Sequence, residues 1–310
     1  MTRAMIRSFA ALSPGLLAAS AFLSLPAAAK TPAPEPRALA ASCAGRDGWA
    51  DPAPPAHIYG NTWYVGTCGI TVLLVTSANG HVLVDGGPEE AAPLVLANIR
   101  KLGFDPRDVR WIVASHEHHD HVGSLAALKV ATGAKVAALG STAAALEAGE
   151  PTLDDPQRGL IARAPSVAVD KVLADGDSVT LTGTGLPLVL TAHATPAHSP
   201  GSTSWTWQSC DPALTCRMIA YADSISTPAA DGYRFSAHPD RVARFALGAD
   251  AIAALPCDIL LTPHPAASAM FERFAAGGAL VDAAACARYA EAGRTRFAAR
   301  LAEEAGKNKP

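Results

Sequence analysis

The chain has 310 residues, of which 49% are hydrophobic and 17% charged, and its formal net charge is −3. This share of apolar residues is enough for a sizeable core and excludes a disordered chain. A small negative net charge gives no reason to expect a nucleic acid as a partner. The length allows one large domain or two small ones.

Residues 1–29 have the pattern of a secretory signal peptide, with a basic start, an apolar stretch over residues 9–25 and small residues before an expected cleavage after Ala29. A membrane anchor is the alternative, but Pro14 interrupts the stretch, and no other segment approaches the ~20 uninterrupted apolar residues of a membrane span. We therefore expect a periplasmic or secreted protein without membrane association after cleavage. Residues 30–310 would form a single domain.

All six cysteines follow the expected cleavage site, and none has the Cys-x-x-Cys spacing of a structural zinc site. In an oxidising compartment they should pair, although buried free thiols are an alternative. Six cysteines can pair in many ways, and the sequence alone does not choose among them. The simplest pairing joins neighbours in the sequence: Cys43–Cys68, Cys210–Cys216 and Cys257–Cys286.

In the first half of the mature chain, short apolar runs alternate with stretches of helical spacing. The strong two-residue turn signal Asn79-Gly80 predicts a hairpin between two of the runs. We expect strands at 62–65, 70–76, 81–84 and 109–114, and helices at 90–102 and 124–130.

The second half repeats this plan and contains a polar segment, 149–165, that we expect to be a long and functional loop. We expect strands at 135–139, 167–173, 178–181, 186–192, 205–208, 217–221 and 258–261, and helices at 239–255 and 283–305. Strands followed by helices, twice over, predict an α+β fold: an αββα sandwich of two mixed β-sheets flanked by helices.

Four of the ten histidines fall within six positions, directly after the predicted strand 109–114. His116 and His118 can point the same way from an extended segment and bind one ion, while Asp120 and His121 can turn toward a second. Imidazole nitrogen and carboxylate oxygen are both normal zinc ligands. A solvated histidine run would not normally follow a buried strand, so the cluster predicts a metal site.

Two isolated histidines are candidates for the remaining ligands. A catalytic zinc needs three protein ligands and an open position. His198 and His264 each follow a predicted strand and are flanked by prolines that restrict the backbone. For His57, His81 and His238 we keep the ordinary interpretation of surface or core residues. A histidine-rich set with one carboxylate favours zinc over iron or manganese.

Four motifs resemble those of the metallo-β-lactamase superfamily and occur in the family's order: Gly60 to Gly66, Val84-Asp85-Gly86-Gly87, Ser115 to Gly123, and Tyr221-Ala222-Asp223-Ser224. The resemblance runs over nearly the whole mature chain. Within the family, the sequence is similar to the third subclass of class B β-lactamases, which has histidine where the first subclass has a cysteine zinc ligand. The six cysteines suit the disulfide-rich members, which favours the neighbour pairing.

The resemblance implies two zinc ions per chain. It assigns the first to His116, His118 and His198, and the second to Asp120, His121 and His264. Ser224 matches the serine in the place of the cysteine ligand, and Ser226 matches a serine that contacts the substrate carboxylate. Gln157 lies in the long loop where some members place a side chain toward the substrate. His119 lies outside this ligand set.

The implied activity is that of a secreted di-zinc β-lactamase, which hydrolyses the β-lactam amide of penicillins, cephalosporins and carbapenems and confers antibiotic resistance. Two zinc ions lower the pKa of a shared water toward ~7, so hydroxide is available to attack the amide. Asp120 would be the catalytic residue that orients it. The partner would be this small-molecule substrate, and we expect a monomer.

Because one fold can host many hydrolases, the substrate stays open. A thioesterase of the glyoxalase II type or a lactonase would use a late aspartate to bridge both metals, and Asp223 stands close to that position; its setting before Ser224 favours a structural role. A zinc-storage protein would saturate its ligands. The sequence has neither Ser-x-x-Lys paired with Lys-Thr-Gly nor Gly-x-Ser-x-Gly, which disfavours a serine hydrolase.

Overall fold

The computed structural model describes residues 1–2, 35–276 and 280–306. The predicted cleavage site and nearly all of the predicted signal peptide lie outside the described residues. Contacts group the described residues from 35 onward into one compact unit. Among the described helices, none is long and apolar enough to cross a membrane.

The first β-sheet has seven strands in sequence order, antiparallel from β1 to β4 and parallel from β4 to β7. Its strands are β1 (Ala56–Tyr59), β2 (Thr62–Tyr64), β3 (Leu73–Ser77), β4 (Gly80–Val84), β5 (Val109–Val113), β6 (Lys135–Leu139) and β7 (Lys171–Leu173). Three helices connect its parallel part: α2 (Ala92–Lys101), α4 (Leu125–Thr132) and α5 (Gly140–Ala148). Their buried side chains form one apolar cluster with Leu83 and Ile112 of the sheet.

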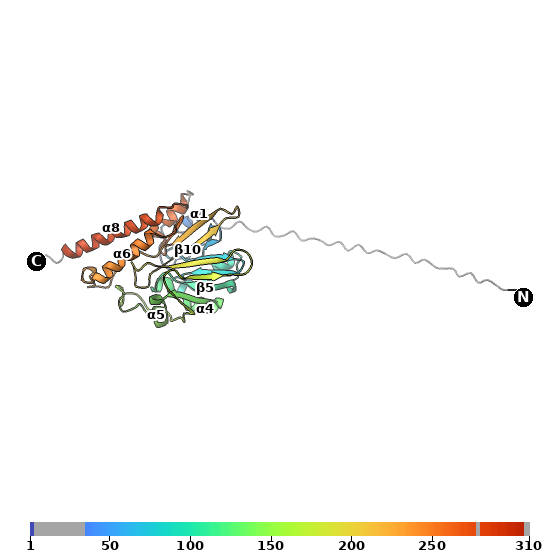
Figure 1. The fold of residues 1–310 in the computed structure, drawn as a ribbon, viewed down its shortest axis with the longest axis horizontal. Helices are drawn as coiled ribbons and strands as arrows, with labels where there is room; N and C mark the ends of the chain where they lie inside the picture. Colours follow the sequence, from blue (N-terminus) through green and yellow to red (C-terminus); the bar gives the residue numbers. More distant parts are fainter. Residues whose placement is uncertain (3–34, 277–279, 307–310) are drawn as a thin grey trace. The chain divides into compact units, whose positions relative to one another are not determined.

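The second β-sheet has five strands in the order β12-β11-β10-β9-β8, and only β11 and β12 run parallel. Its strands are β8 (Ser178–Leu181), β9 (Leu188–Ala194), β10 (Thr203–Cys210), β11 (Cys216–Tyr221) and β12 (Ile259–Leu261). The long helices α6 (Pro239–Ala253) and α8 (Ala285–Gly306) pack beside it, with Phe245 and Phe297 in one cluster with Ala220 and Leu260. Figure 1 shows these two helices on one side and α4 and α5 on the other.

The main core lies between the two sheets. Period-two alternation turns Trp205 and Trp207 of β10 inward, where they meet Val75 and Val84 of the first sheet. Both indole N–H groups have acceptors, since Trp205 Nε1 donates to the Ala114 carbonyl at 2.9 Å and Trp207 Nε1 to a threonine hydroxyl. The predicted αββα sandwich of two mixed sheets is confirmed.

Some elements differ from the prediction. Helix α1 (Pro36–Ser42), strand β1, helix α5 and helix α7 (Met270–Ala275) were not predicted. Alanine occurs on both the buried and the exposed face of α5, so little apolar periodicity is visible in its sequence. The predicted strand 167–173 is only Lys171–Leu173. The predicted Asn79-Gly80 turn lies one residue earlier, because Gly80, with φ +111°, already pairs with Ser77.

Three disulfides join Cys43 to Cys68, Cys210 to Cys216 and Cys257 to Cys286. The first ties α1 to the segment before β3, the second closes the β10–β11 hairpin, and the third ties the segment before β12 to α8. The predicted neighbour pairing is confirmed. Each bridge closes a short loop and therefore restricts the unfolded chain locally.

Candidate metal centre

The histidine cluster directly follows the carboxyl end of β5. Asp85, at the end of the neighbouring strand β4, fixes Ser115, the residue before the first histidine. The Asp85 carboxylate accepts hydrogen bonds from the Ser115 amide at 2.6 Å, the Ser115 hydroxyl at 2.7 Å and the Tyr221 hydroxyl at 2.7 Å. His118 is extended and precedes the one-turn helix α3 (His119–Val122). Because the backbone changes from extended to helical after His118, His116 and His118 belong to one ligand group and Asp120 and His121 to another.

His116, His118 and His198 form the first ligand group, in which one ring nitrogen of each lies within 4.8 Å of the others. His116 Nδ1 contacts the Asp223 carboxylate at 2.8 Å, and His118 Nε2 contacts the Asp155 carboxylate at 2.9 Å. Because a carboxylate accepts, the contacted nitrogen carries the proton in each ring. The opposite nitrogens, His116 Nε2 and His118 Nδ1, are left as acceptors.

His198 reaches this group from the loop between β9 and β10. Its Nδ1 atom donates to the Ser226 carbonyl at 2.8 Å, which leaves Nε2 as an acceptor 3.2 Å from His118 Nδ1. The buried His116 Nε2 atom has no hydrogen-bond partner among the residues that the structure describes. Converging imidazole lone pairs repel one another unless a cation lies between them, so these residues fit a metal ion.

Asp120, His121 and His264 form the second ligand group. The Asp120 Oδ2 atom lies 3.1 Å from His121 Nε2 and 3.3 Å from His264 Nε2, and the two Nε2 atoms are 3.2 Å apart. His121 Nδ1 lies 3.6 Å from the Asp85 carboxylate, beyond a good hydrogen bond. A carboxylate and two imidazoles that converge in this way fit a second metal ion.

The pKa shifts of the ligand candidates suit metal binding. Burial lowers the pKa of His198 to about 3 and holds the pKa of His116 well below its ordinary value. Burial alone would raise the pKa of Asp120, but His121 beside it holds that pKa far below the usual range. Burial disfavours protonated His121, yet the neighbouring Asp120 raises its pKa to about 10. A metal ion at the second group therefore replaces a proton.

The residues expected to face the substrate lie around the first ligand group. Gln157 Nε2 is 3.4 Å from His118 Nδ1 and 3.4 Å from His198 Nε2, so its buried amide reaches the ligand atoms themselves. Ser226 is exposed, and its hydroxyl lies 3.3 Å from His198 Nδ1. Ser224 is buried next to Asp223.

Other histidines stay outside the two ligand groups. His119 is the first residue of α3 and belongs to neither group among the described residues. His57 packs on Trp63, and the ring of His238 stacks on Tyr233 at 4.5 Å. These positions fit the ordinary structural roles expected for them.

Sequence reasoning missed the partners of the ligands. Asp155 was not singled out, although it lies in the 149–165 loop that was expected to be functional. Asp85 stands out in the sequence only as part of the motif Val84-Asp85-Gly86-Gly87. Asp223, the candidate bridging ligand of a thioesterase, is fully buried behind His116 and belongs to neither ligand group among the described residues. This position argues against a role of Asp223 as a ligand that bridges two metal ions.

A fold of two mixed sheets with paired ligand groups at their edge defines a metal-dependent hydrolase. The sequence model described as the metallo-beta-lactamase superfamily matches residues 65–268. The chain belongs to the metallo-β-lactamase superfamily.

Solved structures agree with this family. The metallo-β-lactamase MIM-1 from Novosphingobium pentaromativorans is 64% identical, with a TM-score of 0.85 over 88% of this chain and 99% of that chain. The metallo-β-lactamase SMB-1, bound to 2-mercaptoethanesulfonate, is 43% identical, with a TM-score of 0.78 over 83% of this chain and 99% of that one. MEM-A1, a subclass B3 metallo-β-lactamase from a soil metagenome library, is 38% identical, with a TM-score of 0.79 over 84% of this chain and 100% of its own.

Proposed function

We propose that this protein is a zinc-dependent β-lactamase of subclass B3, which hydrolyses the amide bond of β-lactam antibiotics and confers resistance to them. The observation that carries the proposal is the pairing of a three-histidine group with an Asp-His-His group, while Asp223 lies behind His116. The similarity to MIM-1, SMB-1 and MEM-A1, which are described as metallo-β-lactamases, supports the same reaction.

The proposal assigns two zinc ions to each chain. His116, His118 and His198 would hold the first, and Asp120, His121 and His264 the second. Bound zinc supplies a Lewis acid and lowers the pKa of water toward ~7. Two groups of three ligands leave room for water and substrate, which is typical of catalytic rather than storage sites.

The chain's own residues would position the reactants. Asp120 is the catalytic residue: its carboxylate, ionised at neutral pH, accepts a hydrogen bond from the attacking water and fixes its direction. The Gln157 amide, which reaches the first ligand group, would donate to the substrate. Ser226 would contact the substrate carboxylate, and Ser224 would also bind the substrate, both from the segment after β11.

We further propose that residues 1–29 are a signal peptide and that residues 30–310 act as a monomeric single domain in the periplasm or outside the cell. Three disulfides, with no free cysteine among the described residues, support an oxidising compartment. The partner is the small-molecule β-lactam substrate.

The test uses the purified mature protein with a carbapenem, a penicillin and S-lactoylglutathione, each with and without EDTA. We expect carbapenem hydrolysis that chelation abolishes and zinc restores, and two zinc ions per chain by elemental analysis. Turnover of the thioester alone would replace the proposal with a thioesterase. One zinc per chain would contradict the paired-metal assignment.

A further inference from the structure

The loop 195–202, which carries His198 between β9 and β10, is held from two sides. The elements on either side belong to different layers of the sandwich. One side is the histidine cluster and α5 of the first sheet, and the other is α6, which packs beside the second. The loop is therefore clamped where the layers meet.

Glu117, in the histidine cluster after β5, contacts the loop from the side of the first sheet. Its Oε2 atom accepts a hydrogen bond at 2.8 Å from the hydroxyl of Ser199, the residue directly after His198. Thr142 of α5 donates its hydroxyl hydrogen to the Gly201 carbonyl at 2.8 Å. A Cβ atom on Gly201 would lie 2.3 Å from Thr142 Oγ1 and 2.6 Å from Glu117 Oε2, so the approach requires glycine.

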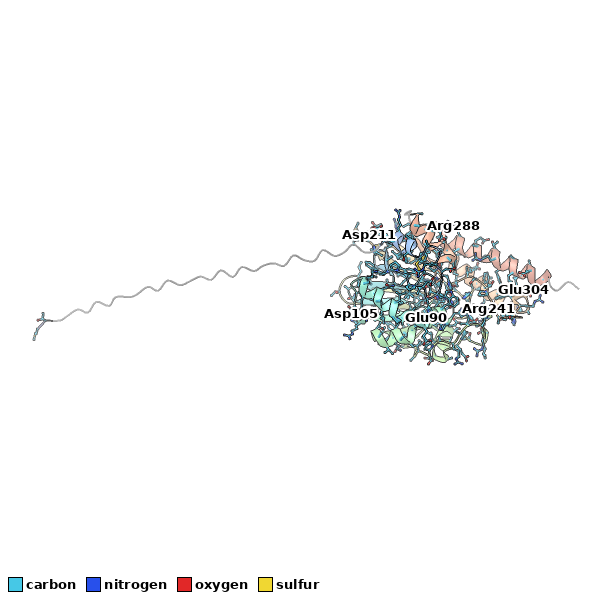
Figure 2. The ribbon with its side chains drawn as sticks, turned by 180° about the vertical axis from the view of Figure 1, so that it is seen from behind. Glu90, Asp105, Asp211, Arg241, Arg288 and Glu304 are labelled. Carbon is cyan, nitrogen blue, oxygen red and sulfur yellow. A yellow bond between two sulfur atoms is a disulfide. The ribbon has the colours of Figure 1, made fainter. Side chains whose placement is uncertain are left out.

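Arg241 of α6 (Figure 2) grips the same loop from the second layer. Its guanidinium nitrogens donate to the Ala197 carbonyl at 3.3 Å and the Pro196 carbonyl at 3.5 Å, just before His198. Gly248 lies seven residues further along, on the same face of the helix. A Cβ atom there would lie 2.5 Å from the Ala197 amide nitrogen.

Stability does not explain the two charged side chains. Glu117 is 3% exposed and Arg241 is 2% exposed, and neither forms a salt bridge within the described part of the chain. Within the same described part, Glu117 Oε1 and Arg241 Nε have no hydrogen-bond partner. A buried ionisable group without a charge partner contributes less to stability than an apolar side chain of similar volume. What both groups do have in common is a contact with the loop that bears His198.

We propose that Glu117 and Arg241 are positioning residues for the first metal site. They hold loop 195–202 from opposite sides, so that His198 Nε2 stays directed at the free nitrogens of His116 and His118. The inference rests on the proposed function in one respect, namely that this group binds zinc.

The experiment measures the affinity of each zinc by competition with a chromophoric chelator. His198→Ala and His264→Ala serve as references that identify which of the two affinities belongs to which site. We expect Glu117→Ala and Ser199→Ala to weaken only the site that His198→Ala weakens, by roughly ten- to a hundredfold. Glu117→Gln, whose amide oxygen still accepts from Ser199, should bind both ions nearly as the wild type does.

The double variant Glu117→Ala, Ser199→Ala separates positioning from a general loss of structure. If Glu117 acts through Ser199, the double variant is no weaker than either single one. Additive losses, or equal weakening of both zinc sites, would overturn the proposal. Should Glu117→Ala fail to fold, Ser199→Ala and Glu117→Gln still decide the question.

The other side of the clamp is tested by Arg241→Met, which keeps the length of the side chain and removes the donors. We expect it to weaken the first site alone. The matched controls are Arg244→Met and Glu147→Ala, which should change neither affinity. Arg244 lies about one helical turn after Arg241 and pairs with Asp154 at 3.0 Å on the surface, and Glu147 is exposed on α5. The zinc content of the wild-type protein is measured before any variant is made. Fewer than two zinc ions per chain would count against the proposed function rather than against this inference.

Discussion

The two ligand groups of this protein are built differently. In the first, all three imidazole rings are buried, and each is held by a hydrogen bond from its other nitrogen to an oxygen of Asp223, Asp155 or Ser226. In the second, the side chain of His264 is 30% exposed, and no hydrogen bond to its Nδ1 atom is found among the described residues. The first group is preorganised by these hydrogen bonds, whereas one ligand of the second group has no such bond within the described part of the chain.

This difference separates two tasks. A ligand whose orientation is set before binding loses little entropy when the metal binds, so the first group should bind more tightly. The second group contains the carboxylate of Asp120, and its His264 is partly exposed to solvent. Four predictions test this comparison, from the largest expected effect to the smallest.

The largest effect is expected from Asp120→Asn, which removes the charge with little change in size. Turnover of a carbapenem should fall by at least about a hundredfold, because the variant loses both a metal ligand and the group that orients the water. Steady-state kinetics at saturating zinc measure it. His119→Ala, next to it but in neither ligand group, should have little effect; equal losses would show that the ligand assignment is wrong.

The preorganisation of the first group depends on its buried carboxylates. Asp155→Asn and Asp223→Asn each weaken the hydrogen bond that orients a histidine, and each should reduce the affinity of the first zinc roughly ten- to a hundredfold. Chelator competition measures the loss, with Asp154→Asn, an exposed neighbour, as the control. If the second zinc weakened instead, the distinction between the groups would fail.

The wild-type protein should release its zinc ions in two steps. We expect the ion of the second group to leave first, with an affinity about tenfold lower than that of the first. Dialysis against a graded series of chelator concentrations, with zinc and activity measured at each, follows the steps. Simultaneous loss of both ions would contradict the comparison.

The smallest effect concerns the metal-free protein, in which His198 and His121 respond to pH in opposite ways. The pKa of His198 falls from 6.5 to about 3 on folding, so its contribution weakens the fold as pH drops from 6.5 toward 3. The pKa of His121 rises to about 10, so its contribution is lost as pH increases from 6.5 to 10.

Thermal unfolding of EDTA-treated protein across this pH range measures both effects. We expect His198→Asn to flatten the acid side of the stability profile and His121→Asn to flatten the alkaline side, each by a few degrees in the midpoint. Profiles that the two variants change in the same direction would show that the two histidines do not differ in this way.

Much of the architecture could be predicted from local pattern. The short apolar runs, the hairpin turn and the two long helices indicate the sandwich, because burial on one face leaves a periodic trace in the sequence. Helix α5 leaves no such trace, since alanine serves on both of its faces. The 149–165 loop was recognised as a loop, but nothing local in it indicates that Asp155 contacts His118.

The sequence by itself indicated the metal chemistry, because His116, His118, Asp120 and His121 lie within six positions directly after a buried strand. It also identified His198 and His264 as candidates, through their positions after strands. Only the tertiary structure decided which nitrogen of each ring is free, since the acceptors come from residues tens to more than a hundred positions away. The clamp on the His198 loop was likewise decided there, because Glu117 and Thr142 of the first layer contact that loop of the second sheet only when the two sheets have packed.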